Sequence, residues 1–531
     1  MSPWIQSRRA FLRASAVAAG AVVLGGCGDG TGLDPALDNV TPAAAGEPSR
    51  GGVLRYGLST DPSNFEPHVT SGAAADVVCQ LCYNGLLAYD DEGEIVGDLA
   101  AEHGWVDERT YQVRLHPEVY FHDGSRMTTS DVVFSFRRML DPATAASAGP
   151  LLDGLEEVRA TGRDTVLFRL REPNAALPSA LASPSANVVS EAWINSGVDP
   201  KTTMMGTGPF RFEERIPGVS LTFRRFDNYF VPELPYLNAI QFVPMEDDYA
   251  RVTALRSATV DMIDYVPATH FGVIQSNPKL RLVSDNTFGF GWVGFVTSKP
   301  PFDDVRVRKA VALALDRQSI LDTAFLGNGE TMTGSLISPE IASYPRRLAG
   351  TVEHDPDQAK FLLRKAGRRN LTLPVVTTSS YSVISRPAEA MLPGLRAAGI
   401  DVQLVRQEWL SFRETVSAKT FPVHSWGSAP SYGDPDALRD FVGTGGSFAT
   451  NLDFSDERVD SLLAQARRAT DDGLREELYY ELEKRVLDLM PMTYTVRREQ
   501  GEAHHDYVRG FRHPPKGAWT QTSLRRTWLE R

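Results

Sequence analysis

Cysteine is rare in this chain, with three residues among 531. Cys27 lies near the N-terminus, and Cys79 and Cys82 stand three positions apart in an apolar segment. A zinc site would need a second pair of ligands, and none is spaced nearby. The spacing favours Cys79 and Cys82 as two buried, unreactive thiols on one helix face, with a local disulfide or a thiol-redox site as the alternatives.

Local signatures of catalysis are also absent. The chain has no GxxxxGK[ST] loop, no GxGxxG after a strand, no HExxH and no GxSxG. Its ten histidines are scattered, and the adjacent His504 and His505 would point to different faces of a helix or strand. The single His424 is more typical of a surface or core histidine than of a ligand or base. We therefore predict a protein that is not an enzyme, with no metal and no cofactor.

No apolar run reaches the roughly 20 residues of a membrane-spanning helix. The longest N-terminal run, residues 14–26, suits the apolar region of an export signal instead. Arg8 and Arg9 precede it, and no acidic residue occurs before Cys27. "SRRAFLR" resembles the twin-arginine export motif and "LGGC" resembles the lipobox before a lipidated cysteine. Residues 1–27 are thus predicted to be a twin-arginine lipoprotein signal; a disordered basic tail is the alternative.

A stretch rich in Gly, Pro, Ala and Asp follows at residues 28–50 and is predicted to be a flexible tether. The protein is then expected outside the cytoplasm, in the periplasm or on the outer face of the cell membrane, with lipid on Cys27 as its only membrane contact. The net charge of the chain is −12, and the signal removes three arginines and no acids, which gives −15. This acidic balance argues against nucleic acid as a partner.

Strand-like and helix-like segments alternate along the roughly 480 residues that remain. "RTYQVRLH", "TVLFRLR" and "VSLTFRRF" alternate apolar and polar residues, as half-buried strands do. "HDPDQAKFLLRKAG" has Asp355 as a helix N-cap, Pro356 at the first helical position and Gly367 as a left-handed stop. The mixture along the whole length predicts an α/β or α+β fold of two or three domains.

Several of these segments resemble one known family in collinear order over about residues 51–515. They include "GGVLRYGLSTDPSNFEPH", "YQVRLHPEVYFHDGSRMTTSDVVFSFRRMLDP", "GTGPFRFEERIPGVSLTFRRFDNYF", "PFDDVRVRKAVALALDR" and "GDPDALRDF". Together they are similar to the extracytoplasmic solute-binding proteins of oligopeptide and dipeptide ABC transporters, family 5. The resemblance implies a two-lobed periplasmic-binding-protein-like fold with hinge strands and an extra subdomain. Its expected parts are lobe I at 51–75, 190–296 and 495–531, an inserted subdomain at 76–189, and lobe II at 297–494.

The resemblance also implies an interlobe site lined by "SWGSAPSYGDPD". In the family's peptide binders, an aspartate between the Trp and the Asp-Pro of this loop pairs with the ligand's α-ammonium; here the matching position is Ala429 or Ser431. No carboxylate precedes Asp434, which matches the structural Asp of Asp-Pro. An unpaired ammonium in a closed cleft is costly, so a neutral, polar ligand is expected. The expected ligand-binding residues are Trp426, Ser428, Ser431, Tyr432, Trp292, Asn64 and Phe65.

The expected function is that of a lipid-anchored binding protein. It would capture a peptide-like or other oligomeric solute in the cleft and deliver it to the permease and ATPase subunits of an ABC importer. A blocked or cyclic peptide, an oligosaccharide or an opine-like compound fits the neutral loop best. The protein is expected to be a monomer. An exported surface hydrolase and a sensor that presents its ligand to another receptor are the alternatives on the same fold.

Overall fold

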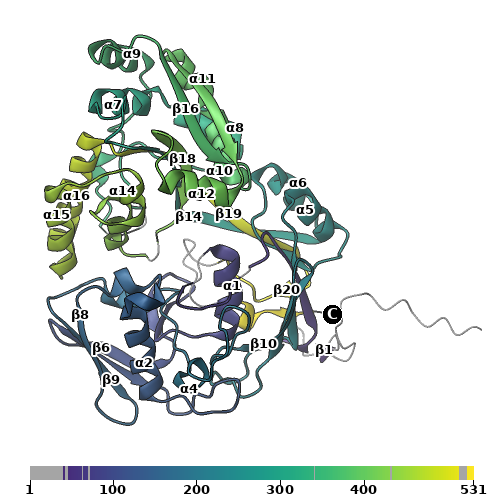
Figure 1. Ribbon diagram of the computed structural model, residues 1–531. Coiled ribbons are helices and arrows are strands. Elements are labelled where there is room, and N and C mark those ends of the chain that lie inside the picture. The colour runs from purple at the N-terminus through teal and green to yellow at the C-terminus, as the bar shows by residue number, and fades with distance from the viewer. Residues whose placement is uncertain are drawn as a thin grey trace, which may run out of the picture.

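The computed structural model describes residues 40–41, 46–62, 64–69, 72–339, 341, 343–430, 433–513 and 523–530. The predicted signal, with Arg8, Arg9 and Cys27, lies outside these residues, as do Ser431 and Tyr432. The body has two halves, one above the other in Figure 1, joined by long strands on one side. No helix among the described residues has the length and apolar character required to cross a membrane.

One mixed sheet runs through both halves. Its strand order is β10-β11-β12-β3-β13-β19-β14-β18-β16-β17, and β15 (Gly329–Thr331) pairs with β19 off this path. In that order the strands are Phe210–Ile216, Ser220–Arg225, Ala239–Pro244, Val53–Leu58, Met262–Ile263, Met492–His505, Leu280–Phe295, Val423–Ser428, Leu371–Thr378 and Ile400–Gln407.

The two central strands, β14 and β19, carry the sheet from one half to the other. They have 16 and 14 residues and pair antiparallel from Leu280 opposite His505 to Gly294 opposite Met492. On the first-half side β19 pairs with β13, and on the other side β14 pairs with β18. Every remaining strand of this sheet therefore takes its position from this one pair (Figure 1).

A separate four-stranded antiparallel sheet forms the outer part of the lower half in Figure 1. Its order is β6 (Ala100–Asp107), β7 (Thr110–Leu115), β9 (Thr165–Leu170) and β8 (Leu155–Ala160). Helix α2 (Thr129–Leu140) packs on it, and the alternating apolar residues that predicted β7 and β9 are buried there. Smaller two-stranded pairs are β4 (Leu87–Tyr89) with β5 (Ile95–Gly97), β20 (Val508–Arg509) with β21 (Trp528–Leu529), and β1 (Val40–Thr41) with β2 (Arg50–Gly51).

Helices cover the sheets where the sequence places their caps. Asp355 accepts a hydrogen bond from the Gln358 amide and starts α9, and Thr128 starts α2 with a capping box. The other helices are α1 Ala73–Cys82, α3 Leu177–Leu181, α4 Glu191–Ile194, α5 Asp248–Arg256, α6 Phe271–Gln275, α7 Val305–Ala314, α8 Arg317–Phe325, α9 Pro356–Lys365, α10 Ser382–Ala390, α11 Leu392–Ala397, α12 Trp409–Ser417, α13 Arg439–Val442, α14 Ser447–Asn451, α15 Glu457–Arg468 and α16 Asp472–Leu489.

The end of the predicted tether belongs to the folded body. Ser49 donates its hydroxyl to the Leu529 carbonyl at 2.9 Å. Arg50, in β2, forms an ion pair with Glu233 at 2.8 Å. Any flexible connection to Cys27 must therefore end before these residues.

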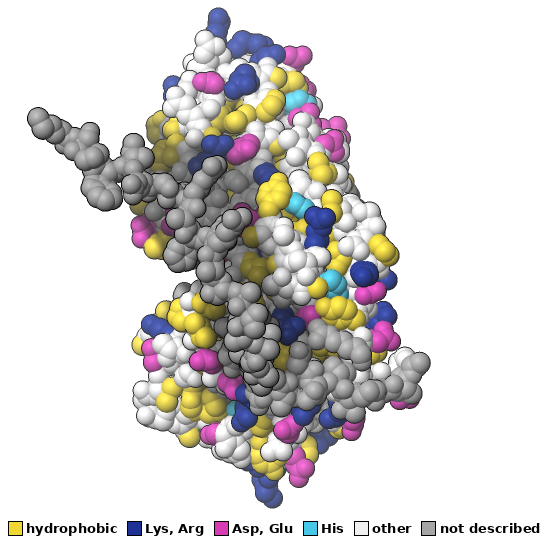
Figure 2. Space-filling model, turned by 90° about the vertical axis from the view of Figure 1, so that its right-hand side faces the viewer, with side chains coloured by type: hydrophobic (Ala, Val, Ile, Leu, Met, Phe, Trp, Pro, Cys, Tyr) yellow, Lys and Arg dark blue, Asp and Glu magenta, His cyan; other side chains and the backbone are white. Residues whose placement is uncertain are grey.

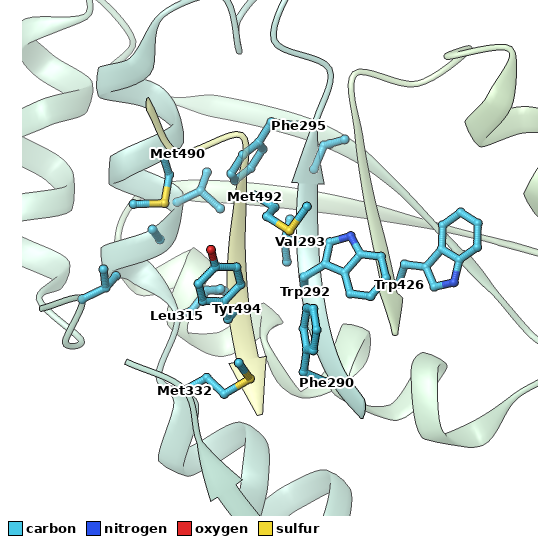
Figure 3. Packing of buried hydrophobic residues seen from close by; sticks show 14 of the residues in the cluster. Phe290, Trp292, Val293, Phe295, Leu315, Met332, Trp426, Met490, Met492 and Tyr494 are labelled. Carbon is cyan, nitrogen blue, oxygen red and sulfur yellow. The ribbon is translucent and has the colours of Figure 1, made fainter. Parts of the chain in front are cut away.

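An aromatic cluster forms the centre of the second-half core (Figure 3). Trp292 on β14 and Trp426 on β18 are register partners, so both rings lie on the same face of the sheet, and they stack with centroids 6.1 Å apart and planes at 10°. The Trp426 ring also meets Trp409, Phe412 and Phe448 edge-on at 5.7, 5.0 and 5.6 Å. Trp292 is 1% exposed and Trp426 is 9% exposed.

Because Trp426 is packed on several sides, we expect Trp426→Ala to destabilise the ligand-free protein by about 3–5 kcal/mol, as large-to-small core substitutions do. Urea unfolding measures this loss. The matched control is Trp105→Ala on β6, where the indole is 42% exposed and the loss should stay within about 1 kcal/mol. An unchanged Trp426→Ala midpoint together with lost solute binding would instead make this indole a ligand wall.

Candidate functional site

The segment after β18 connects the two halves of the molecule. It leaves the sheet at Ser428, and Gly433 donates its amide to the Tyr89 hydroxyl at 3.1 Å, which ties the second half to the small β4–β5 pair. Ser431 and Tyr432, both predicted to bind ligand, lie between these points and outside the described residues. Ser428 is half-buried, with its hydroxyl 3.5 Å from the Ala429 carbonyl.

Two of the predicted ligand contacts lie in the core. Phe65 is 0% exposed, and its ring packs against Phe212 at 5.5 Å in the core of the first half. Trp292 is buried beneath Trp426 rather than opposite it across a gap, because the two strands that carry them are neighbours. Neither ring offers a surface to a solute in this conformation. Asn64 is half-buried, and its side-chain oxygen accepts the Glu66 amide at 3.0 Å.

Both carboxylates of the Asp-Pro-Asp segment are held in ion pairs. Asp434 caps the short 3-10 helix Pro435–Leu438 and meets Arg475 at 2.7 Å, with both side chains nearly buried. Asp436 is buried and meets Arg467 at 2.5 Å and Arg439 at 3.7 Å. Desolvation lowers and Asp434 raises the pKa of Arg475, and the balance lies above its ordinary value. These carboxylates fix the loop and are already neutralised, as expected for the structural Asp434.

A cavity opens beside this loop. Its non-atom space is about 270 Å³ including the open mouth. It lies between β14, the segment 336–338 and the loop, and it is lined by Phe288, Leu336, Ile337, Ser338, Pro430, Asp434, Pro435, Ala437 and Leu438. Most of this lining is apolar and its polar groups are few, and in this conformation the space has room for about one water molecule.

Behind the cavity, Glu483 holds the segment 336–337 in place. Its carboxylate accepts the amides of Leu336 and Ile337 at 2.7 and 3.3 Å. Burial raises the pKa of Glu483 to about 7. Neither this residue nor the 336–338 wall was predicted from the sequence, because an apolar segment between strands carries no local signal of a pocket.

Further contacts close the two halves on each other. Ser382 at the start of α10 donates to the Asp248 carboxylate on α5 at 2.9 Å. The Ala175 amide donates to the Arg467 carbonyl at 2.8 Å, and Arg468 forms an ion pair with Glu172. The described chain is therefore a conformation in which both halves touch at more than one place away from β14 and β19.

Among the described residues, no arrangement of side chains suggests a catalytic site. No group of three or more His, Cys, Asp or Glu is placed there to hold a metal ion. Cys79 and Cys82 are free and buried, and burial raises the pKa of both thiols, which opposes thiolate reactivity. On the face in Figure 2, basic and acidic side chains are interspersed rather than gathered into one basic surface.

Known proteins share this architecture over nearly the whole chain. AgaA from A. tumefaciens R10, solved with agropinic acid, is 32% identical, covers 90% of this chain and 99% of its own, and superposes with a TM-score of 0.83. The peptide-bound DppA of Helicobacter pylori superposes with a TM-score of 0.82 at 21% identity, over 91% of this chain and 99% of its own. This likeness gives the fold: a mixed α/β, two-lobed periplasmic binding protein.

Sequence comparison leads to the same family. The glutathione-binding protein GsiB of Pectobacterium atrosepticum is 25% identical over 85% of this chain and 89% of its own length. The oligopeptide-binding protein AppA of Bacillus subtilis is 24% identical over 89% and 91%. Residues 94–449 match the family model described as bacterial extracellular solute-binding proteins, family 5 Middle. The chain therefore belongs to the family 5 bacterial extracellular solute-binding proteins, the extracytoplasmic, non-enzymatic binding components of peptide-type ABC importers.

Proposed function

We propose that the protein captures a peptide-like or other polar oligomeric solute between its lobes and delivers it to an ABC importer while lipid on Cys27 holds it at the membrane. The observation that carries this proposal is the loop 428–438, which reaches from the second half to Tyr89 of the first and lines a largely apolar cavity. A solute bound beside this loop, between the two halves, would favour their closed arrangement.

The lobes in this proposal have the boundaries expected from the sequence. Lobe I comprises 51–75, 190–296 and 495–531, the inserted subdomain 76–189, and lobe II 297–494. The distribution of the core supports three parts but moves two edges: the α1 residues up to Tyr83 pack in the lobe I cluster, and Phe290 to Phe295 of β14 pack in the lobe II cluster. One hydrophobic cluster gathers residues from 86 to 188 with Met205, and another gathers residues from 290 to 496. Each part thus has apolar packing of its own, as separate domains do.

The occupied carboxylates of the loop support a solute without a free α-ammonium at that position. Asp434 and Asp436 already pair with arginines. A buried ammonium next to them would find no unneutralised partner in the described part of the loop, at a cost of several kcal/mol. An N-blocked or cyclic peptide, an oligosaccharide or an opine-like compound avoids this cost. AgaA binds agropinic acid, which makes that compound a sensible member of any first panel.

We expect N-acetylated tri- to pentapeptides, oligosaccharides or agropinic acid to raise the melting temperature of the protein. A solute at 100 times its Kd stabilises the folded state by about 2.7 kcal/mol, which differential scanning fluorimetry detects. Each acetylated peptide is paired with its free-amine form as the control. Binding by the free-amine forms with loss on acetylation would contradict the proposed loop chemistry.

For the lipid anchor, we expect Cys27→Ser to move the protein from the membrane fraction to the soluble extracytoplasmic fraction, because no acyl chain can then be attached. Cys79→Ser is the matched control and should leave the protein in the membrane fraction, since Cys79 is a buried thiol of the core. Fractionation followed by immunoblotting measures both. Membrane retention of Cys27→Ser would rule out lipid on this residue.

A further inference from the structure

Helix α1 presents two polar side chains, Asp76 and Gln80, that lack a hydrogen-bond or ion-pair partner among the described residues. Its apolar residues, including Val77, Val78 and Leu81, pack into the first-half core. Asp76 and Gln80 are four positions apart and therefore lie one above the other on a different face of the helix. In Figure 1, α1 lies on the side of the lower half that faces the upper half.

Asp76 has no partner for its carboxylate among the described residues. It forms no hydrogen bond there and no ion pair within 4.0 Å, although it is only partly exposed. It does not cap its own helix, because the cap residue is Gly72 and the Asp76 amide bonds to the Gly72 carbonyl in the ordinary way. Burial raises the pKa of Asp76 to about 7, and desolvation is the cause.

Gln80 repeats this pattern one turn along the helix. Its side chain is 6% exposed, and its Nε2 amide is buried with no hydrogen-bond acceptor. A buried donor without an acceptor costs folding free energy. Two unsatisfied polar groups, an acceptor and a donor, are thus kept on one face of a helix whose opposite face is well packed.

The position of this face in the fold is that of a ligand site. Strand β3 runs parallel to β12 and β13, and α1 follows the carboxyl end of β3. Ligands of open α/β sheets bind outside the carboxyl ends of such strands. Tyr265 follows β13 at the same edge and interacts electrostatically with Asp76. Arg498 of β19 lies over the Tyr265 ring at 5.1 Å, which places this edge beside the strands shared by both halves.

We propose that Asp76 binds a cationic nitrogen of the solute, an ammonium or a guanidinium, with Gln80 donating a hydrogen bond to a neighbouring oxygen of the same molecule. This inference rests on the proposed function and adds the charge of the solute to it. A cation would satisfy the Asp76 carboxylate, which has no partner among the described residues, whereas Asp434 and Asp436 are already neutralised. The cationic group would therefore lie on the α1 side of the cleft, away from the loop 428–438.

The test uses matched peptide probes whose amino termini are acetylated. One member of each pair carries Lys or Arg, and its twin carries acetyl-lysine or citrulline, which keeps the shape and removes the charge. We expect the protein to bind the charged members more tightly by at least about 30-fold, the effect of a buried charge partner. Asp76→Asn should abolish this preference, and Gln80→Leu should weaken binding of the charged members. Asp401→Asn, an exposed carboxylate on β17, is the matched control and should behave as wild type.

Stability without solute separates a binding role from a structural one. The folded-state pKa of Asp76, about 7, lies above its ordinary 3.8, so its contribution to stability is lost as pH rises from about 4 to 7. Cys79 on α1 and Tyr265, with Arg498 over its ring, are the ionisable groups that face it. Asp76→Asn should therefore melt a few degrees higher than wild type at pH 8 and equally at pH 4. A lower melting temperature at pH 8 would make Asp76 structural and overturn the proposal.

The remaining outcomes are also decisive. If charged and neutral twins bind equally well, Asp76 does not recognise charge and the inference is overturned. The same holds if neutral solutes stabilise the wild type and the charged peptides do not. In both cases the proposed function still stands. Stabilisation by no solute of any charge, for wild type and Asp401→Asn alike, contradicts the proposed function itself. Loss of the charge preference in Asp76→Asn alone supports the inference.

Discussion

The antiparallel pairing of β14 with β19 is the constraint on which the rest of the structure depends. Since one pair of strands belongs to the sheet of both halves, their register sets where β13 ends on one side and where β18 ends on the other. Tyr265 follows β13 in the first half and Ser428 ends β18 in the second, and β19 and β14 lie between these two strands. Two segments about 160 residues apart in the chain thus take their positions from the same two strands.

Paired carboxylates give the second side of that cleft its fixed form. Asp434 and Asp436 each have an arginine partner from α15 or α16, so the loop is attached to the helical layer behind it rather than left to adapt to a solute. Removing one member of such a pair would leave a buried charge uncompensated, which is more destabilising than the pair is stabilising. The loop therefore contributes shape and apolar surface. Its two carboxylates are already paired with arginines, so they are not free to bind a charged group of the solute.

Local signals predicted the elements far better than they predicted the site. The N-cap at Asp355 and the alternation in β7 and β9 depend only on neighbours in the chain, and all are confirmed. Whether Trp292 faces a solute or the core depends on its register partner on β18, far along the sequence, and the structure places it in the core. Phe65, also predicted to contact the solute, packs in the core of the first half against Phe212, a residue far along the sequence. Residues whose role is set by strand order cannot be assigned from spacing alone.

Asp76 and Asp434 show why a count of carboxylates near a motif is a poor guide to recognition. The carboxylate of Asp434 is neutralised by Arg475, whereas the carboxylate of Asp76 has no partner in the described chain. Buried carboxylates without a partner are uncommon, because an unpaired buried charge lowers stability and a neutral residue at the same position raises it. A buried polar group without a hydrogen-bond or ion-pair partner is therefore a position where a ligand is expected to supply that partner. On this reasoning the helix that follows β3, and not the loop that carries the family's sequence motif, reads the charge of the solute.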